Sequence, residues 1–231
     1  MKGKFYGVGV GPGDPELITL KAINVLKKCD CVVIPKAEGR DSTVFKIAKE
    51  YINKDTEICE VSFSMVKDSE KRQKSREEAA YTISKHIDMG KNVVFITLGD
   101  ISVYSTCMYV YKILVEKGYN CELIPGVPSF CAVASKVGES LGEDGESFGI
   151  VPSALGTEKL SKATKSFDTV VIMKSAKNID TVKEILKEEG FDNVKGVMNC
   201  GLENERVFMN NDDIEGDLGY FTTLIAKRGE K

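Results

Sequence analysis

The stretch Tyr6-Gly7-Val8-Gly9-Val10-Gly11-Pro12-Gly13-Asp14-Pro15 changes from apolar residues to glycine close to the start of the chain. The apolar run from Phe5 to Val10 predicts a buried strand, and Pro12-Gly13 predicts the turn that ends it. Asp14 and Pro15 then predict a helix, with Asp14 as its N-cap and Pro15 at its first position, and Thr19 is a second candidate cap. A strand, a glycine turn and a helix in this order bind nucleotide-like ligands in many proteins. The stretch therefore predicts an α/β protein with a ligand site at this turn.

The spacing of these glycines excludes the two commonest nucleotide motifs. Gly9-x-Gly11-x-Gly13 is not the dinucleotide pattern G-x-G-x-x-G, and Pro12 stands where Gly7-x-Gly9 would need a third glycine. The sequence also has no Gly-Lys-Ser/Thr, so a phosphate-binding P-loop is absent. One alternative remains open at this point: the glycines serve only to let the strand and the helix pack tightly.

Composition limits the classes of partner. The chain has 231 residues, enough for one large or two small domains, and a net charge of −3. A protein that binds mainly nucleic acid needs a clear basic excess, so we expect no nucleic-acid partner. No apolar run approaches the roughly 18 residues of a membrane span, and the N-terminus lacks the layout of a signal peptide. We therefore expect a cytoplasmic protein without a membrane partner.

The cysteines and the histidine argue against a protein-bound metal. Seven cysteines, an odd number, are scattered through apolar segments, as expected for reduced thiols in a cytoplasm. The chain has no Cys-x-x-Cys, and His86 is its only histidine. From this pattern we predict no zinc or iron site built by the protein.

The first half of the chain alternates strands and helices. Apolar runs predict strands at 31–34, at 57–61 on a sheet edge, at 92–98 and at 120–124. This order favours a parallel sheet covered on both faces, and ligands on such sheets lie beyond the carboxyl ends of the strands. Gly11 to Gly13 and Gly99-Asp100 both occupy that edge. A helix over 103–117, apolar on more than one face, is expected to be buried or to lie at an interface, and Tyr104 to face the ligand.

Pro125-Gly126-Val127-Pro128 breaks the chain near its middle and predicts a boundary between domains 1–124 and 125–231. Helices are expected at 129–137, 157–165 and 179–189, and strands at 148–151, 168–173, 194–199 and 220–226. The segment 206–209 is expected to form a hairpin with the last strand. No helix separates the final segments, which predicts a mixed sheet. The acidic, glycine-rich segment 138–147 is expected to be mobile.

Three segments together resemble the tetrapyrrole (corrin/porphyrin) methylases. These are YGVGVGPGDPELITLKA at 6–22, TLGDISVYST at 97–106 and PGVPSF at 125–130. Each motif alone is weak, whereas the ordered set is specific and the similarity runs along the whole chain. Within this family, YSTCMY at 104–109 and GESLGE at 138–143, which precedes FGIVP at 148–152, are most similar to members that methylate C20 of precorrin-2 or cobalt-factor II.

The resemblance implies a class III methyltransferase fold, in which two αβα domains enclose a cleft, and a homodimer that acts in cobalamin (vitamin B12) biosynthesis. It implies that S-adenosylmethionine binds and leaves as S-adenosylhomocysteine. By position, the residues expected at this cofactor are Pro12, Leu98, Gly99, Asp100, Val103, Tyr104, Pro128, Ser129, Met173, Asn199 and Gly201. The tetrapyrrole is expected over Gly9, Gly11 and Gly13. Ile101 departs from the family, since many relatives have proline after Gly-Asp.

No activated serine or cysteine is needed in such a reaction, because the conjugated macrocycle supplies the electrons for an in-line methyl transfer. The protein mainly orients the reactants in a dry cleft. Asp100 is the best-placed carboxylate to remove the C20 proton, but cofactor anchoring is the favoured role for it.

One rival hypothesis keeps the fold and another belongs to a different class. The first is a methylase of the same fold that acts on uroporphyrinogen, another precorrin position, diphthine or ribosomal RNA, and the acidic balance disfavours RNA. The other is a non-catalytic module that binds a tetrapyrrole or a nucleotide. A cobalt chelatase is disfavoured, because such enzymes hold the metal with paired histidines and this chain has one.

Overall fold

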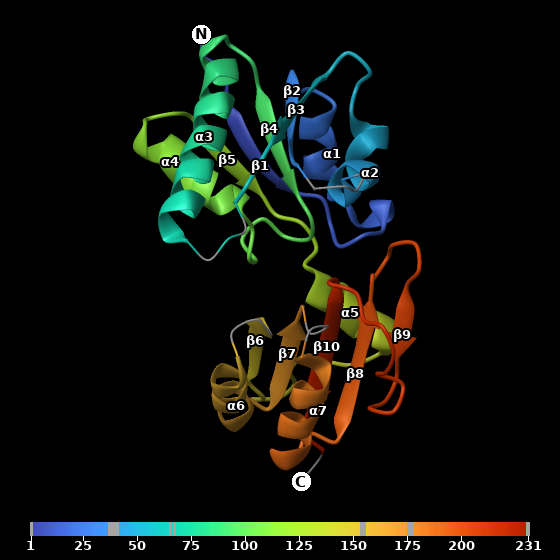
Figure 1. Ribbon diagram of the computed structural model, residues 1–231. Coiled ribbons are helices and arrows are strands. Elements are labelled where there is room, and N and C mark those ends of the chain that lie inside the picture. Colours follow the sequence, from blue (N-terminus) through green and yellow to red (C-terminus); the bar gives the residue numbers. More distant parts are fainter. Residues whose placement is uncertain are drawn as a thin grey trace. The chain divides into compact units, whose positions relative to one another are not determined.

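The computed structural model describes residues 2–36, 42–64, 66, 68–152, 156–174 and 178–229. The chain forms two compact units, Met1–Pro128 and Ser129–Lys231 (Figure 1). The sequence places the division after residue 124, whereas residues 125–128 group with the first unit. One physical reason is that the backbone N–H of Gly126 donates a hydrogen bond to Asp100 of that unit.

The first unit contains a five-stranded parallel sheet. Its strands are β1 (Phe5–Gly9), β2 (Cys31–Pro35), β3 (Glu57–Val61), β4 (Val93–Thr97) and β5 (Cys121–Ile124), in the order β3-β2-β4-β1-β5. All four pairings are parallel. β1, β2 and β4 are almost fully buried, which is why each reads as an unbroken apolar run. The predicted parallel sheet and the edge position of 57–61 are confirmed.

Helices cover both faces of this sheet. In Figure 1, α3 (Ser69–Asp88) and α4 (Cys107–Glu116) lie on one face, and α1 (Leu20–Leu26) and α2 (Thr43–Ala48) on the other. Short 3₁₀ turns, η1 (Pro15–Leu17) and η2 (Lys49–Tyr51), precede α1 and follow α2. The core under α3 and α4 contains Phe95, Ile83 and Val110, each fully shielded from solvent. Tyr111 packs against this core, as expected.

Both predicted caps near the start of the chain are confirmed, but one predicted helix start further along is wrong. Asp14 caps the short turn η1, and Thr19 caps α1, since its hydroxyl accepts a hydrogen bond from the Ala22 N–H. The helix expected from residue 103 begins at Cys107. Local side-chain bonds hold residues 100–106 in a non-helical turn, because Asp100 and Ser105 bind backbone N–H groups within this segment.

The second unit contains a mixed five-stranded sheet, as predicted. Its strands are β6 (Phe148–Pro152), β7 (Thr169–Met173), β8 (Asn193–Met198), β9 (Arg206–Phe208) and β10 (Thr222–Lys227), in the order β6-β7-β10-β8-β9. Only β6 and β7 pair in parallel. The hairpin expected between 206–209 and the last strand is wrong, because β9 pairs with β8 and β10 lies between β7 and β8.

The helices of the second unit follow the predicted ranges closely. They are α5 (Ser129–Val137), α6 (Thr157–Ser166) and α7 (Ile179–Glu188). Leu160 of α6 and Leu186 of α7 contribute to one core, together with Val170 and Leu224 of the sheet. The apolar period of α7 explains its burial, since Val182 and Leu186 lie one turn apart.

The acidic segment 138–147, expected to be mobile, is bonded to the sheet of the second unit. Lys227 at the end of β10 donates to Ser140 at 2.9 Å and pairs with Glu146 at 2.9 Å. Glu139 pairs with Lys195 of β8 at 2.9 Å. Asp168 accepts from the backbone N–H and the hydroxyl of Ser147. The sequence shows the charges of this segment but not its distant partners.

We expect Lys227→Met to release this segment locally. The substitution keeps the aliphatic stem but removes the ammonium that joins Ser140 and Glu146, so amide hydrogen exchange over 138–147 should become several-fold faster. Lys159→Met on the exposed surface of α6 is the matched control and should leave these amides unchanged. Unchanged exchange in Lys227→Met would show that the ion pairs do not hold the segment.

Candidate functional site

Two glycine turns meet at the carboxyl edge of the first sheet. The Gly99 N–H donates to the Gly11 carbonyl at 2.7 Å, and the Gly11 N–H donates to the Gly99 carbonyl at 3.2 Å. Both glycines have positive φ, 82° for Gly11 and 70° for Gly99, a conformation that other residues adopt only with strain. The prediction that the two turns occupy one edge is confirmed.

Asp100 joins a third turn to the first two. Its Oδ2 accepts from the Gly126 N–H at 2.9 Å, while its Oδ1 accepts from the backbone N–H of Ser102 at 2.8 Å and from the Ser102 hydroxyl. Burial acts to raise the pKa of Asp100, but these hydrogen bonds outweigh it and hold the pKa below the ordinary value. The carboxylate is thus ionised at neutral pH, and it fixes the position of the residues around Gly126.

The absence of side chains at Gly9 and Gly126 serves backbone packing. A Cβ on Gly9 would lie 2.6 Å from the Gly99 carbonyl oxygen, and one on Gly126 would lie 2.3 Å from the same atom. At Gly11 a Cβ would lie 3.2 Å from the Leu17 carbonyl oxygen in η1. Close packing against the segment after the strand, the alternative offered for the glycine motif, is seen at Gly11, whereas Gly9 and Gly126 are close to the backbone of other turns. Direct contact of Gly9, Gly11 or Gly13 with a substrate stays a prediction.

The turn after Asp100 holds Tyr104 in an unusual conformation. Tyr104 has φ of 49°, and half of its surface is exposed. Burial of the rest of the side chain raises the pKa of its hydroxyl. The buried Ser105 donates to Thr97 at 3.2 Å and accepts from the Cys107 N–H at 3.2 Å, which ties the turn to β4 and to the start of α4. Strained residues held by their surroundings are common at ligand sites.

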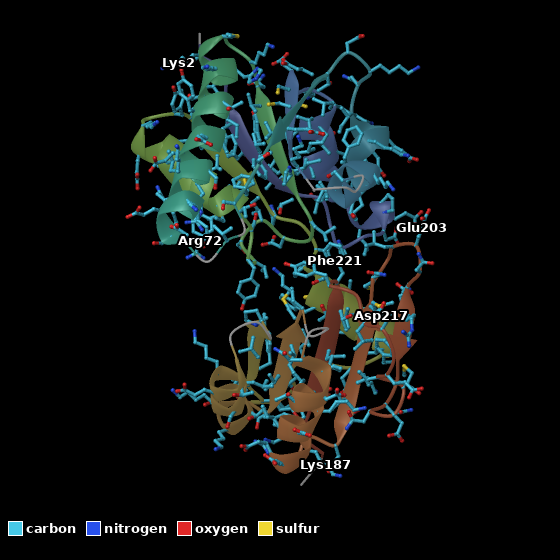
Figure 2. All side chains as sticks on the ribbon, viewed as in Figure 1. Lys2, Arg72, Lys187, Glu203, Asp217 and Phe221 are labelled. Atoms are coloured by element: carbon cyan, nitrogen blue, oxygen red, sulfur yellow. The ribbon has the colours of Figure 1, made fainter. Side chains whose placement is uncertain are left out.

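Candidate residues of the second unit gather at one edge of its sheet. Met173 ends β7, and Asn199 directly follows β8; both lie at the level of the start of β10. The Asn199 N–H donates to the carbonyl of Phe221 (labelled in Figure 2) at 3.1 Å. Asn199 and Lys174, the residue after Met173, both have positive φ, of 56° and 61°. Gly201, with φ of 73°, donates to Glu205 at 2.7 Å.

The predicted site residues therefore form two groups, one in each unit. In the first unit the structure gathers Gly9, Gly11, Pro12, Gly13, Leu98, Gly99, Asp100, Val103 and Tyr104 around the carboxyl edge of the sheet, and Pro128 ends that unit. In the second unit Ser129 begins α5, and Met173, Asn199 and Gly201 lie at the sheet edge. Leu98 and Val103 are half-buried, while Pro12 and Gly13 are buried.

Sequence reasoning missed the residues that position these groups. Ser102, Ser105 and Gly126 make the hydrogen bonds that shape the turns. Ser102 and Ser105 stand within the motif 97–106 and Gly126 within the motif 125–130, so the motifs contain them. Their partners could not be read from the sequence, since Gly126 is 26 positions from Asp100.

The first group combines two half-buried apolar side chains, Leu98 and Val103, with backbone groups that are paired within the turns. The Gly99 N–H and carbonyl bond to Gly11, and the Val103 N–H donates to the Asp100 carbonyl at 3.4 Å. The Asp100 carboxylate is committed to Ser102 and Gly126, so it shapes the turn instead of offering a free anionic group.

Among the residues that the structure describes, no helix has both the length and the apolar character needed to cross a bilayer.

The sequence matches a known protein family and several named relatives. Residues 4–213 match the family model of the Tetrapyrrole (Corrin/Porphyrin) Methylases. A probable cobalt-precorrin-2 C(20)-methyltransferase of Methanocaldococcus jannaschii is 39% identical over 171 residues, which cover 74% of this chain and 71% of that protein. The cobalt-precorrin-2 C(20)-methyltransferase of Salmonella typhimurium is 30% identical over 174 residues, 75% of this chain and 73% of that protein.

Similarity to solved structures extends over nearly the whole chain. The crystal structure of uroporphyrin-III C-methyl transferase from Thermus thermophilus, complexed with S-adenyl homocysteine, aligns with a TM-score of 0.69. The alignment covers 97% of this chain and 92% of that chain at 22% sequence identity. This likeness shows that the two chains share a fold.

Proposed function

The chain belongs to the tetrapyrrole (corrin/porphyrin) methylase family, and on this premise we propose that it transfers the methyl group of S-adenosylmethionine to C20 of precorrin-2 or cobalt-factor II. The observation that carries the position of methylation is the identity to two relatives named for reaction at C20. The proposed place of the reaction is cobalamin biosynthesis in the cytoplasm. The cleft between the domains and the homodimer implied by the resemblance are part of the proposal.

In the first unit, the residues proposed to hold S-adenosylmethionine are Leu98, Gly99, Asp100, Val103 and Tyr104, with Pro12 and Pro128 beside them. In the second unit they are Ser129, Met173, Asn199 and Gly201. When bound, the cofactor supplies a methyl group activated by a sulfonium. The apolar side chains of Leu98 and Val103 exclude water from their neighbourhood. Ordering of the reactants is the main contribution of such a site, for which roughly 7–11 kcal/mol is available.

Asp100 is proposed as a positioning residue. A general base works best with a pKa near the operating pH, whereas the hydrogen bonds from Ser102 and Gly126 lower the pKa of Asp100. The same bonds occupy both carboxylate oxygens. Asp100 therefore orders the turns that bind the cofactor, and the base for the C20 proton is not assigned to it.

The expected activity is methyl transfer to C20 by the purified chain. Incubation with isotopically labelled S-adenosylmethionine and either metal-free or cobalt-loaded substrate, followed by mass measurement and NMR location of the label, tests it directly. A label at another carbon would favour the second candidate, a methylase of another tetrapyrrole position, to which the uroporphyrin-III enzyme is a structural parallel. Light scattering of the same sample, compared with the chain mass of 25.4 kDa, tests the homodimer.

A non-catalytic binding module remains the rival from another class. It predicts that S-adenosylmethionine does not bind, or that it binds without loss of its methyl group in the presence of tetrapyrrole. Calorimetric titration with S-adenosylmethionine, followed by assay for S-adenosylhomocysteine, separates the two. Binding without turnover on both forms of the substrate would contradict the proposed activity.

A further inference from the structure

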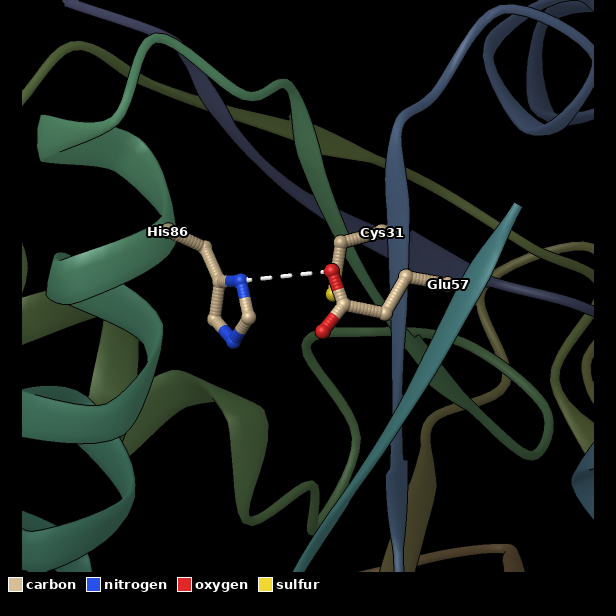
Figure 3. Close-up of side chains that lie close together, drawn as sticks. All are labelled: Cys31, Glu57 and His86. Atoms are coloured by element: carbon tan, nitrogen blue, oxygen red, sulfur yellow. Dashed lines mark ion pairs between the residues drawn. The ribbon is translucent and has the colours of Figure 1, made fainter. Parts of the chain in front are cut away.

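The side chains of Cys31, Glu57 and His86 lie together at the amino-terminal edge of the first sheet (Figure 3). Cys31 begins β2, Glu57 begins β3, and the two residues are register partners. His86 stands in the last turn of α3, which packs on this face of the sheet. One ligand atom of each residue lies within 4.8 Å of the other two. This edge is opposite the carboxyl edge that carries Gly99 and Asp100.

We propose that Cys31, Glu57 and His86 form a binding site for one divalent transition-metal ion of the zinc type. A thiolate, an imidazole nitrogen and a carboxylate oxygen are the ligand types that zinc prefers in proteins. Tetrahedral zinc places such ligand atoms roughly 3.4–3.8 Å apart. The His86 Nδ1 and a Glu57 carboxylate oxygen are already 3.6 Å apart, and no separation in the group exceeds 4.8 Å, so an ion requires at most a shift of about an ångström. Water completes the coordination. The site does not depend on the proposed methyltransferase function.

The imidazole of His86 has a buried ring nitrogen that faces this site. The Nδ1 atom of His86 is shielded from solvent and makes no hydrogen bond with the residues that the structure describes, although a carboxylate oxygen of Glu57 lies 3.6 Å away. Buried polar nitrogens are normally hydrogen-bonded, so an ion at this position would satisfy an atom that has no hydrogen-bond partner in the described part of the chain. Figure 3 shows the ring turned toward the Glu57 carboxylate.

A cation already occupies the neighbourhood of the Glu57 carboxylate. The ammonium of Lys91 lies 2.5 Å from the same oxygen that faces His86. The turn after α3 brings Lys91 close to His86, because the Lys91 N–H donates to the His86 carbonyl and Gly90 has φ of 87°. The end of a helix also favours positive charge. Lys91 is partly exposed, so its ammonium can move into solvent when a metal ion takes its place.

The charges balance when the ion binds. Cys31 is fully buried, and burial, helped by Cys59 and Glu57, raises the pKa of its thiol to about 12. On binding, the S–H bond breaks, the proton goes to solvent and a metal–sulfur bond forms. Thiolate and carboxylate then carry two negative charges, which one divalent ion neutralises.

A cavity of ≈ 700 Å³ lined by Asp30, Asp55, Glu57 and Lys91 gives an ion a route from solvent to the carboxylate.

This inference differs from the sequence-based expectation of no metal site. That expectation rested on the single histidine and on the absence of Cys-x-x-Cys. The three ligands come from positions 31, 57 and 86, so no local sequence motif indicates that they form a metal site. They become neighbours only when β2 pairs with β3 and α3 covers the sheet.

The single histidine gives the test a specific signal. The full chain, reduced and freed of metal, is titrated with ZnCl₂ alone while the one imidazole is observed by ¹⁵N NMR. We expect one Zn²⁺ per chain and a shift of the imidazole signals to the form protonated at Nε2, as Nδ1 coordination requires. Binding of Co²⁺ should produce a thiolate-to-metal charge-transfer band in the near ultraviolet. Unshifted imidazole signals at full zinc loading would overturn the proposal.

Variants separate the ligands from other groups. Cys31→Ser should weaken zinc binding by at least about ten-fold and abolish the charge-transfer band. Cys121→Ser is the matched control, because Cys121 lies on β5, the edge strand farthest from β3. It should change neither the zinc affinity nor the charge-transfer band. If Cys31→Ser does not fold, Glu57→Gln at an exposed position serves instead, with the same expected loss. Lys91→Met should tighten binding, since it removes the competing cation. Equal affinity in all variants would overturn the proposal.

Discussion

Asp100→Asn is expected to weaken S-adenosylmethionine binding by about ten- to a hundred-fold. The carboxylate accepts from Ser102 on one oxygen and from Gly126 on the other. An amide has one oxygen, so in either orientation its NH₂ group faces a backbone N–H that has lost its acceptor. Loss of a hydrogen bond to a charged group costs about 1.5–3 kcal/mol, which corresponds to the expected loss of affinity. Calorimetry with S-adenosylmethionine measures it.

Ser102→Ala is the matched control for this substitution. It removes the hydroxyl contact to Asp100 but leaves the backbone bonds from Ser102 and Gly126, so its effect on affinity should be clearly smaller. The rate at saturating S-adenosylmethionine should fall less than the affinity in Asp100→Asn. Near-normal affinity with a saturated rate reduced by about a hundred-fold or more would instead identify Asp100 as the base.

The same hydrogen bonds give stability a defined dependence on pH. Because the pKa of Asp100 is lower in the folded chain than the ordinary 3.8, its carboxylate stabilises the fold above that value. The stabilisation decreases as the pH falls from about 3.8 through the lower pKa of the folded state. The difference in unfolding free energy between the wild type and Asp100→Asn should therefore be constant near neutral pH and shrink in acid.

The sheet of the first unit could be predicted because three of its strands, β1, β2 and β4, are almost fully buried. Cys31 to Ile34 reads as a continuous apolar run before Pro35, and Val93 to Leu98 reads as a nearly continuous one before Gly99. The meeting of two glycine turns at the carboxyl edge followed from this sheet, since Gly11 and Gly99 each come two residues after a strand. Local pattern and long-range structure agree at these positions.

Helix starts were predicted less well, because local side-chain hydrogen bonds compete with the helix. Val103 and Cys107 have helical spacing, yet Asp100 binds the Ser102 N–H before them and Ser105 between them binds Thr97 and the Cys107 N–H, which favours a turn. The partner of β9 was also missed. Val207 and Phe208 could pair with either neighbour in the sequence, and only the packing of the sheet selects β8.

The interpretation of the glycines changed most. The sequence motif offered a ligand contact or tight packing as explanations for Gly9, and the structure places three backbone segments at that point. Gly126 approaches Gly9 and Gly99 from a position far along the chain, so its role depends on tertiary contact. A motif read from sequence gives the residues but not the atoms that they approach.

Gly126→Ala is accordingly expected to lower the free energy of unfolding by about 3 kcal/mol, at the upper end of the usual range for overpacking. The added Cβ would lie 2.3 Å from the Gly99 carbonyl oxygen and 2.7 Å from the Gly9 carbonyl oxygen, and neither backbone can move aside as a flexible side chain would. The backbone at Gly126 has no positive φ, so the expected cost comes from contact alone. Urea unfolding, followed by NMR signals of residues in the first unit, measures this loss of unfolding free energy.

Gly229→Ala is the matched control, because a Cβ at that position meets no atom within 4 Å and should leave stability nearly unchanged. Gly9→Ala places a Cβ 2.6 Å from the same Gly99 oxygen, so it should destabilise by a similar amount. Since either substitution displaces the Gly99 turn, the double variant should lose less stability than the sum of the two single losses. If the losses of unfolding free energy are additive, the two added Cβ atoms act on separate contacts. A Gly126→Ala protein with wild-type stability and normal S-adenosylmethionine affinity would show that close approach of the three turns is not required.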